Sequence, residues 1–521
     1  MKKELWEMYK RDSQKGEKTI KAFNPNVEDI FAGIDTIADF ESTKWHSYNY
    51  AEDAKDYFNL VFINFGVFES SNSDKELTRE LYENFIDKFE LKDIIVDSEG
   101  IGHIKEDGKV IVRKDNYREK AAATRLLSLY LYYNYDFFKP MLLPTRFDII
   151  QRNCDLLGIE LPDLPRTKKY KDYCMYYYDI CQCWNEFQQE NDMTDAEFCA
   201  CLYDFADMLA EEKQESELPE PTNVWLTGAS GKGDFEFVDA LGTDDTYNKE
   251  HVWACNERTR RGDIVVMYCL SPRSYIHSIW RANSGGIFNP FDNYHCRTTV
   301  CDGIRVPDIT FNDLKGDDYF KEVPIVRKNL QGINGWELTA KDYNELQRII
   351  EQKGGDISTL PKLFNGGDID FGKLEKEKNV EEQILIPALR GLGYKDTDWT
   401  RQLSLKAGRK EKAIPDFVFF PTGQEHFETA PMVIEAKLDM SSVTEQNKAF
   451  KQAFSYLKML RSKLMAICDK ERIVVYRANA NGAVDKSNPM FENHWKAIFA
   501  DSVIGANLKK IIGAEVIKTL S

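Results

Sequence analysis

Two short apolar runs near the C-terminus constrain the fold most, because they fix how this part of the chain can pair with itself. Residues 414–420 read IPDFVFF, residues 432–437 read MVIEAK, and the segment 421–431 joins them. Runs of this length and content are typical of buried strands. If the two strands form an antiparallel hairpin, Asp416 and Glu435 are neighbours at its open end.

Alternation along the second strand decides which side chains meet there. It places Glu435 and Lys437 on one face and turns Ala436 toward the core. Two carboxylates and an ammonium group then converge on one spot. Hard divalent cations such as Mg²⁺ prefer oxygen ligands of this kind, and they promote attack of water on a phosphate. The arrangement therefore favours hydrolysis of a phosphodiester bond.

The E-x-K spacing carries little weight alone, because 90–92 and 211–213 have it too. An exposed Glu and Lys on a strand are more often simply solvated. The order of the neighbouring segments adds the weight. An amphipathic helix is expected over 382–394, kinked at Pro387 and ended by a left-handed Gly393. A second helix follows the hairpin, and in it Gln452 and Tyr456 share one face.

In this order the segment 375–480 resembles the PD-(D/E)XK nuclease superfamily, in particular the N-terminal nuclease domain of type I restriction motor subunits and the archaeal Holliday-junction resolvases. The resemblance implies that Glu382, Asp416, Glu435 and the backbone of Ala436 hold a metal ion and that Lys437 positions or activates water. It also implies that Gln452 and Tyr456, in a Q-x-x-x-Y motif, contact the site and DNA. We expect the helix glutamate to be Glu382 rather than Glu381, from its spacing to Gly393. No G-x-x-x-x-G-K-[ST] motif is present, which excludes a motor subunit.

The middle of the chain, 223–353, alternates strand-like runs with turns. The runs that begin at Val224, Arg261 and Trp336 resemble the pattern of EVE and related PUA-like domains, small barrels that are associated with modified bases. Aromatic rings can stack on a flipped base. Trp225 and Tyr268 are the preferred residues of such a pocket, with Trp253, Trp280 and Trp336 as further candidates. For each of these rings, a place in the core is the alternative.

Composition shifts along the chain set the expected domains. We expect a mixed α/β region over 1–140, a helical region over 141–215, the PUA-like β-barrel over 223–353 and an α/β nuclease fold over 375–521. The charged, proline-bearing stretch 211–221 is the expected linker. The fold class predicted is therefore multidomain α+β. In the helical region, Thr194 is an expected helix N-cap, three residues before Glu197.

The charge is unevenly distributed. The chain has 521 residues and a formal net charge of −17. Residues 371–521 carry 24 Lys and Arg against 19 Asp and Glu, whereas residues 1–370 carry 45 against 67. Binding of nucleic acid needs clustered cations, so a polyanion-binding surface is expected in the C-terminal part.

Cysteine usage and the N-terminus indicate the compartment. The eleven cysteines include no C-x-x-C pair, so neither a disulfide framework nor a zinc ribbon is indicated. The first residues, MKKELW, lack the apolar core of a signal peptide, and no apolar run is long enough to span a membrane. A cytoplasmic protein without membrane association is expected.

These observations predict a Mg²⁺-dependent deoxyribonuclease, with Mn²⁺ as a possible substitute, that acts as a modification-dependent restriction enzyme in antiviral defence. DNA is the expected partner, RNA stays open, and a homodimer or larger assembly is expected for cutting both strands. Two alternatives remain: a structure-specific junction or repair nuclease, and a nucleic-acid-binding regulator with an inactive nuclease fold.

Overall fold

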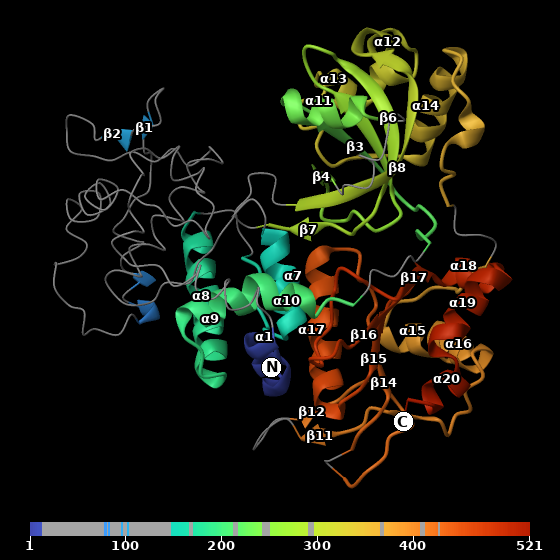
Figure 1. Cartoon of the computed structure of the whole chain (residues 1–521). Coiled ribbons are helices and arrows are strands. Elements are labelled where there is room, and N and C mark those ends of the chain that lie inside the picture. The colour runs from blue at the N-terminus through green and yellow to red at the C-terminus, as the bar shows by residue number, and fades with distance from the viewer. Residues whose placement is uncertain are drawn as a thin grey trace. The chain divides into compact units, whose positions relative to one another are not determined.

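The computed structural model describes residues 1–12, 78–80, 82–83, 95–96, 102–103, 147–165, 170–211, 217–241, 251–289, 296–364, 369–406, 412–425 and 428–520 (Figure 1). The chain divides into two compact units. Unit 1 contains residues 1–211 with two short later segments, 289–295 and 479–483, and unit 2 contains the remainder.

The described part of unit 1 is mainly helical. Thr194 caps α9 with a capping box, since its side chain accepts a hydrogen bond from the backbone of Glu197 and the Glu197 side chain accepts one in return. This confirms the expected N-cap. The elements are α1 (Lys3–Asp12), β1 (Ile95–Val96), β2 (Gly102–His103), α7 (Phe147–Leu157), α8 (Tyr170–Glu190), α9 (Asp195–Ala200), a π-helical turn (Cys201–Phe205) and α10 (Ala206–Met208).

The first lobe of unit 2 is built on a seven-stranded sheet that curves as a half-barrel. Its main path has the order β4-β8-β6-β5-β3-β9, and β7 pairs with β8. Only the pair β3 and β5 is parallel. The strands are β3 (Val224–Ala229), β4 (His251–Ala254), β5 (Ile264–Cys269), β6 (Tyr275–Ala282), β7 (Ile287–Phe288), β8 (Cys296–Thr310) and β9 (Trp336–Leu338).

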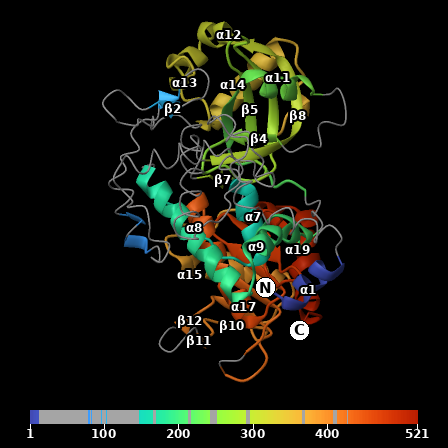
Figure 2. The same cartoon turned by 60° about the vertical axis from the view of Figure 1, so that its left-hand side comes forward.

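Both faces of this sheet are covered. On one face, a hydrophobic core lies between the sheet and the helices that follow β8. These helices lie at one end of the lobe in Figure 1 and in Figure 2. A second, smaller core forms on the other face, where Val238 of α11 packs. The helices are α11 (Gly231–Asp239), α12 (Phe311–Gly316), α13 (Pro324–Arg327) and α14 (Ala340–Gln352), with 3₁₀ turns at Phe320–Glu322 and Ile357–Thr359.

The second lobe of unit 2 carries a six-stranded sheet with the order β10-β13-β14-β15-β16-β17. Strands β14 and β15 are parallel and are connected through α17, and the other neighbours are antiparallel. The strands are β10 (Trp399–Arg401), β13 (Phe417–Phe419), β14 (Met432–Ala436), β15 (Leu464–Cys468), β16 (Arg472–Arg477) and β17 (Phe491–His494), and β11 (Leu405–Lys406) pairs with β12 (Lys412–Ala413) apart from this sheet.

Helices cover the two faces of this sheet (Figure 1). Helix α17 (Val443–Leu460) lies on one face, and α15 (Glu377–Val380), α16 (Ile386–Gly391), α18 (Trp495–Ala500), α19 (Ser502–Ile512) and α20 (Ala514–Lys518) lie on the other. The α16 and α19 side packs against Ile434 and Ala436 of β14. Because side chains alternate, Val433 and Glu435 point toward α17.

Unit 2 is therefore mixed α/β with two principal sheets, and the chain as described agrees with the expected multidomain α+β class. The segments 223–353 and 375–521, expected as separate domains, lie in the same compact unit. Among the described residues, no helix has the length and apolar character needed to cross a membrane.

Candidate functional site

The expected hairpin is present and brings Asp416 and Glu435 together. Strands β13 and β14 are antiparallel with Phe417 opposite Ile434, so Asp416 lies opposite Glu435. Asp416 Oδ2 accepts a hydrogen bond from the backbone N–H of Ala436 at 2.8 Å. The Ala436 side chain is buried in the core, as the alternation along the strand predicted.

Glu435 is the most constrained group of the site. Glu435 as a whole is 1% exposed. Lys437 Nζ donates to Glu435 Oε1 at 2.6 Å, while Oε2 is buried and makes no hydrogen bond with any described residue. Burial, followed by the negative charge of Asp416, raises the pKa of Glu435 to about 8, despite the opposing effect of Lys437. In the absence of a cation, Glu435 is thus mostly protonated at neutral pH.

Lys437 remains charged in this environment. Burial lowers its pKa, but the hydrogen bond with Glu435 and the negative charge that Glu435 carries when ionised outweigh that effect and raise the pKa of Lys437 above its ordinary value. Glu377 Oε1 lies 4.0 Å from the same ammonium group. Lys437 therefore acts as a cation in the metal-free site and not as a proton acceptor.

The helix carboxylate that faces the site is Glu381 and not Glu382. Glu381 is buried, its carboxylate binds Arg401, and burial with a contribution from Asp416 raises its pKa. The Glu382 side chain is 48% exposed and lies 3.6 Å from Lys378. The structure therefore places Glu381, and not the expected Glu382, beside Asp416.

The structure of the helix explains why Glu381, and not Glu382, faces the site. Residues Glu381–Leu385 form a π-helical turn between α15 and α16, immediately before the proline at 387. The wider turn changes which side chains face inward relative to a regular α-helix. Gly393 has the positive φ, +95°, that was expected after this helix.

Gln452 and Tyr456 lie on α17, the helix that covers the Glu435 face of the sheet. Gln452 Nε2 donates to the Tyr456 hydroxyl at 3.0 Å. Burial raises the pKa of Tyr456, the hydrogen bond from Gln452 opposes this, and the charges of Glu435, Asp416 and Lys437 act on the hydroxyl as well. The two residues of the Q-x-x-x-Y motif are therefore close to the carboxylates.

Carboxylate oxygens are the ligands that a hard cation prefers. In the metal-free site, however, Glu381 is paired with Arg401 and Glu435 with Lys437. The charge of Asp416 acts on both Glu435 and Glu381, and Glu435 Oε2 is buried without a hydrogen-bond partner among the described residues. No group of three or more His, Cys, Asp or Glu side chains in the described ranges already has the geometry of a metal site. Glu381 is held by Arg401 and Glu435 by Lys437, so binding of a cation requires these pairs to open.

Three charged groups of the site were not predicted. Helical periodicity could have indicated Glu381, because it precedes the buried Ile384 and Leu385 by three and four residues. Arg401 comes from β10, which pairs with β13 and places Arg401 opposite Phe417, and no sequence motif marks it. Glu377 lies too far from the hairpin in sequence for any local pattern to connect them.

The aromatic residues expected to form a base pocket do not form one. Tyr268 packs in the core on one face of the half-barrel sheet, with Trp336 half-buried against it, and Trp253 and Trp280 pack in the core on the other face. Trp225 is buried and donates Nε1–H to Asp263 Oδ2 at 2.8 Å. A half-barrel covered on both faces needs such rings as core, and four of the five, all except the half-buried Trp336, are buried.

Comparison with known proteins adds little to this geometry. No protein-family model matches the chain. No curated protein matches it. A solved structure described as the "NMR structure of Rpa0253 from Rhodopseudomonas palustris" is similar to a part of it, with a TM-score of 0.21 and 12% identity over 25% of this chain and 94% of that chain.

Proposed function

We propose that the chain is a divalent-metal-dependent endonuclease that hydrolyses phosphodiester bonds of DNA. The observation that carries the proposal is the buried Glu435 carboxylate beside Asp416, with one oxygen on Lys437 and the other without a hydrogen bond among the described residues. Ionising Glu435 beside Asp416 is costly because the two charges repel, and a buried carboxyl oxygen without a partner is a further cost. A bound cation would remove both costs.

The acidic and basic residues of the site would have different roles. Asp416, Glu435 and Glu381 would hold Mg²⁺, or Mn²⁺ in its place, through carboxylate oxygens. When bound, such a cation supplies positive charge that activates water and neutralises a phosphate. Once Glu435 is engaged, the ammonium group of Lys437 is free to orient water or to stabilise charge on the phosphate oxygens. Gln452 and Tyr456 offer hydrogen bonds to water or to the DNA backbone.

The half-barrel lobe is the candidate for substrate choice. It shares a compact unit with the carboxylate site, and a cavity lies where residues of the two lobes meet. We propose that cleavage depends on base modification, which would make the chain a modification-dependent restriction enzyme of antiviral defence. The rings once expected as the pocket are core residues, so the recognition surface must lie elsewhere on this lobe.

A cleavage panel tests both parts of the proposal. Plain, methylated, hydroxymethylated and glucosylated DNA are incubated with the full chain and Mg²⁺. We expect cutting of at least one modified DNA, and loss of that cutting in Asp416→Asn and Lys437→Met. Equal cutting by these variants would refute the assigned site. Equal cutting of all four DNAs would leave a nuclease but remove modification dependence.

The alternatives give different outcomes in the same assay. A junction nuclease would cut branched DNA in preference to linear DNA of any modification. A regulator with an inactive nuclease fold would bind DNA and cut none of the DNA or RNA substrates with either metal. The intact Asp416, Glu435 and Lys437 favour an active enzyme.

A further inference from the structure

A second polar site lies between the two lobes of unit 2. Its cavity measures about 340 Å³, within the range of small-ligand sites, ~300 Å³ and above. Four cationic residues and one carboxylate line it, together with polar and ring side chains: Arg258, Arg260, Lys470, Lys496, Glu471, Thr222, Asn223, Ser441, Phe364 and His494. A chain with a net charge of −17 thus presents an excess of cations here.

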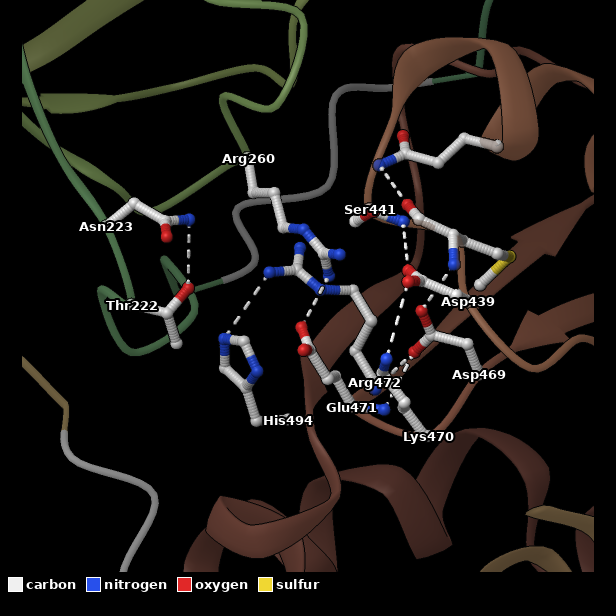
Figure 3. A network of polar contacts seen from close by, with 12 residues as sticks. Thr222, Asn223, Arg260, Asp439, Ser441, Asp469, Lys470, Glu471, Arg472 and His494 are labelled. Atoms are coloured by element: carbon white, nitrogen blue, oxygen red, sulfur yellow. Dashed lines mark hydrogen bonds and ion pairs between the residues drawn. The ribbon is translucent and has the colours of Figure 1, made fainter. Parts of the chain in front are cut away.

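Arg260 of the lining and Arg472, on which the charge of Arg260 acts, are both deeply buried. Arg260 lines the cavity and is 3% exposed, and its Nη1 makes no hydrogen bond with the described residues, although Glu471 Oε2 lies 3.4 Å away. Arg472 is 2% exposed, and its Nε is likewise without a hydrogen bond in the described ranges. Figure 3 shows both guanidinium groups near the centre of the network.

These two like charges act on each other. Burial, and then the charge of Arg260, lowers the pKa of Arg472. Arg472 is compensated by Glu492, whose Oε1 lies 2.5 Å from its Nη1. For Arg260, the one carboxylate within ion-pair distance in the described ranges is that of Glu471, whose side chain is 48% exposed. Because a buried cation without a close partner is costly, an anion entering from the cavity would stabilise Arg260.

A ring pair completes the lining. Phe364 and His494 stack with their centroids 5.7 Å apart. Burial and the charges of Arg472 and Arg260 lower the pKa of His494 to about 2, so its ring is neutral at physiological pH. The cavity therefore combines a cationic wall with an uncharged ring surface.

The turn that carries Arg260 is fixed by its own lobe. Asp263 accepts hydrogen bonds from the backbone of Arg260, from Asn223 and from the Trp225 ring nitrogen. Gly262 has a φ of +92°, and a Cβ there would lie 2.3 Å from the carbonyl oxygen of Pro219. Arg260 is thus held in place before any ligand binds, which lowers the entropic cost of binding.

The cavity and the carboxylate site share one edge of the six-stranded sheet. The parallel strands β14 and β15 end side by side at Ala436 and Cys468. Lys437 follows the first strand and Lys470 and Glu471 follow the second. The two connections are joined, because Met440 donates its N–H to Asp469 Oδ2 at 2.7 Å and Lys470 Nζ lies 3.3 Å from Asp439 (Figure 3).

From this juxtaposition we infer that the cavity is a nucleotide subsite for the DNA strand that the carboxylate site cuts. One phosphate binds Arg260 and Lys496, displacing Glu471, and the attached nucleoside lies against the Phe364 and His494 rings. The inference rests on the proposed function for the identity of the strand. The anion site itself rests on the buried arginine and the cavity.

Binding is measured without cleavage to test this inference. The full chain is titrated in EDTA with a fluorescent 12-nucleotide single strand and with the corresponding duplex, and anisotropy is recorded at several salt concentrations. We expect Lys496→Gln to weaken binding about tenfold and to reduce the salt slope by about one contact. Glu471→Gln removes a competing carboxylate and should strengthen binding several-fold.

The controls separate this site from general charge. Lys509→Gln removes an exposed lysine of the same lobe, and Arg327→Gln removes an exposed arginine of the other; both should bind as the wild type does. Arg260→Gln should abolish the salt-sensitive contact, with circular dichroism reporting its folding. Because Lys496 is only half-buried, its variant tests the inference even where Arg260→Gln fails to fold.

The outcomes are distinguishable from those of the proposed function. If Lys496→Gln and Glu471→Gln bind DNA as Lys509→Gln does, the inference is wrong, whether or not the enzyme cuts. If they change binding while no DNA is ever cut, the inference holds and the nuclease proposal fails. Inorganic phosphate and a deoxynucleoside 5′-monophosphate are tested by thermal shift. If these ligands stabilise the wild type while Lys496→Gln and Glu471→Gln still bind DNA as the wild type does, the cavity is a site for a free nucleotide and the DNA subsite is refuted.

Discussion

Lys437 Nζ lies 2.6 Å from Glu435 Oε1, while the second oxygen of the same carboxylate is buried without a hydrogen bond in the described part of the chain. Lys437 thus neutralises only half of a carboxylate that also faces Asp416. The metal-free site consequently keeps a proton on Glu435, with a pKa of about 8. Proton, lysine and metal ion compete for the same group, and this competition determines how the site responds to pH.

The first prediction concerns stability in EDTA. A carboxyl group whose pKa is raised on folding destabilises the folded state once it ionises, so the free energy of unfolding falls as pH rises from about 4.5 toward 8. Glu435→Gln removes this term and keeps the shape of the neutral acid. At pH 9 the variant should exceed the wild type by roughly 2–4 kcal/mol, since each pKa unit corresponds to about 1.4 kcal/mol.

Urea unfolding at pH 4.5, 7 and 9 measures this difference. At pH 4.5 the two proteins should be nearly equal. Glu382→Gln alters an exposed carboxylate next to the site and should stay within about 0.5 kcal/mol of wild type at every pH. A Glu435→Gln variant that is less stable than wild type at pH 9 would contradict the raised pKa.

The second prediction concerns metal binding. A cation must displace the proton from Glu435, so binding of Mg²⁺ at pH 7 should release about one proton per ion. At pH 9 the group is already ionised and the release should vanish. Isothermal titration calorimetry in two buffers of different ionisation enthalpy measures the number of protons. Unchanged proton release at pH 9, or binding that survives Asp416→Asn, would argue against this site.

The third prediction separates two adjacent glutamates. Glu381 is buried beside Asp416 and Arg401, whereas Glu382 is exposed near Lys378. In the cleavage assay with a modified DNA, Glu381→Gln should reduce the rate at least tenfold at limiting Mg²⁺, with partial recovery at high Mg²⁺, because loss of a ligand lowers metal affinity by about 10-fold or more. Glu382→Gln should cut at the wild-type rate. The reverse result would restore the sequence-based assignment.

This one-residue difference shows what a sequence pattern can predict. Asp416, Glu435 and Lys437 were placed correctly because the hairpin is local and its side chains alternate strictly. The helix glutamate was misplaced because a π-helical turn over 381–385 interrupts the regular period. Spacing to Gly393 carries no information about that turn.

The half-barrel shows a different limit. Three of its strands, β3, β5 and β9, fall in the expected runs, but a run that is buried on both faces does not reveal which side of the sheet each ring occupies. Tyr268, a preferred pocket residue, and Trp253, a further candidate, accordingly belong to opposite cores. The cavity was beyond prediction, because Arg260 and His494 meet only after both lobes have folded.

The last prediction concerns Trp225, a residue expected from the sequence to stack on a base. Its ring nitrogen donates to Asp263, which is 1% exposed and also holds the backbone of Arg260. Trp225→Phe removes this donor and keeps most of the ring. We expect a loss of about 1.5–3 kcal/mol in unfolding free energy, as for a buried hydrogen bond to a charged group. Trp336→Phe, at a half-buried ring on the neighbouring strand, should cost less.

DNA binding by Trp225→Phe should weaken equally for plain and modified DNA, because Arg260 shifts while no base contact is lost. Selective loss of modified DNA would instead return Trp225 to a role in base recognition.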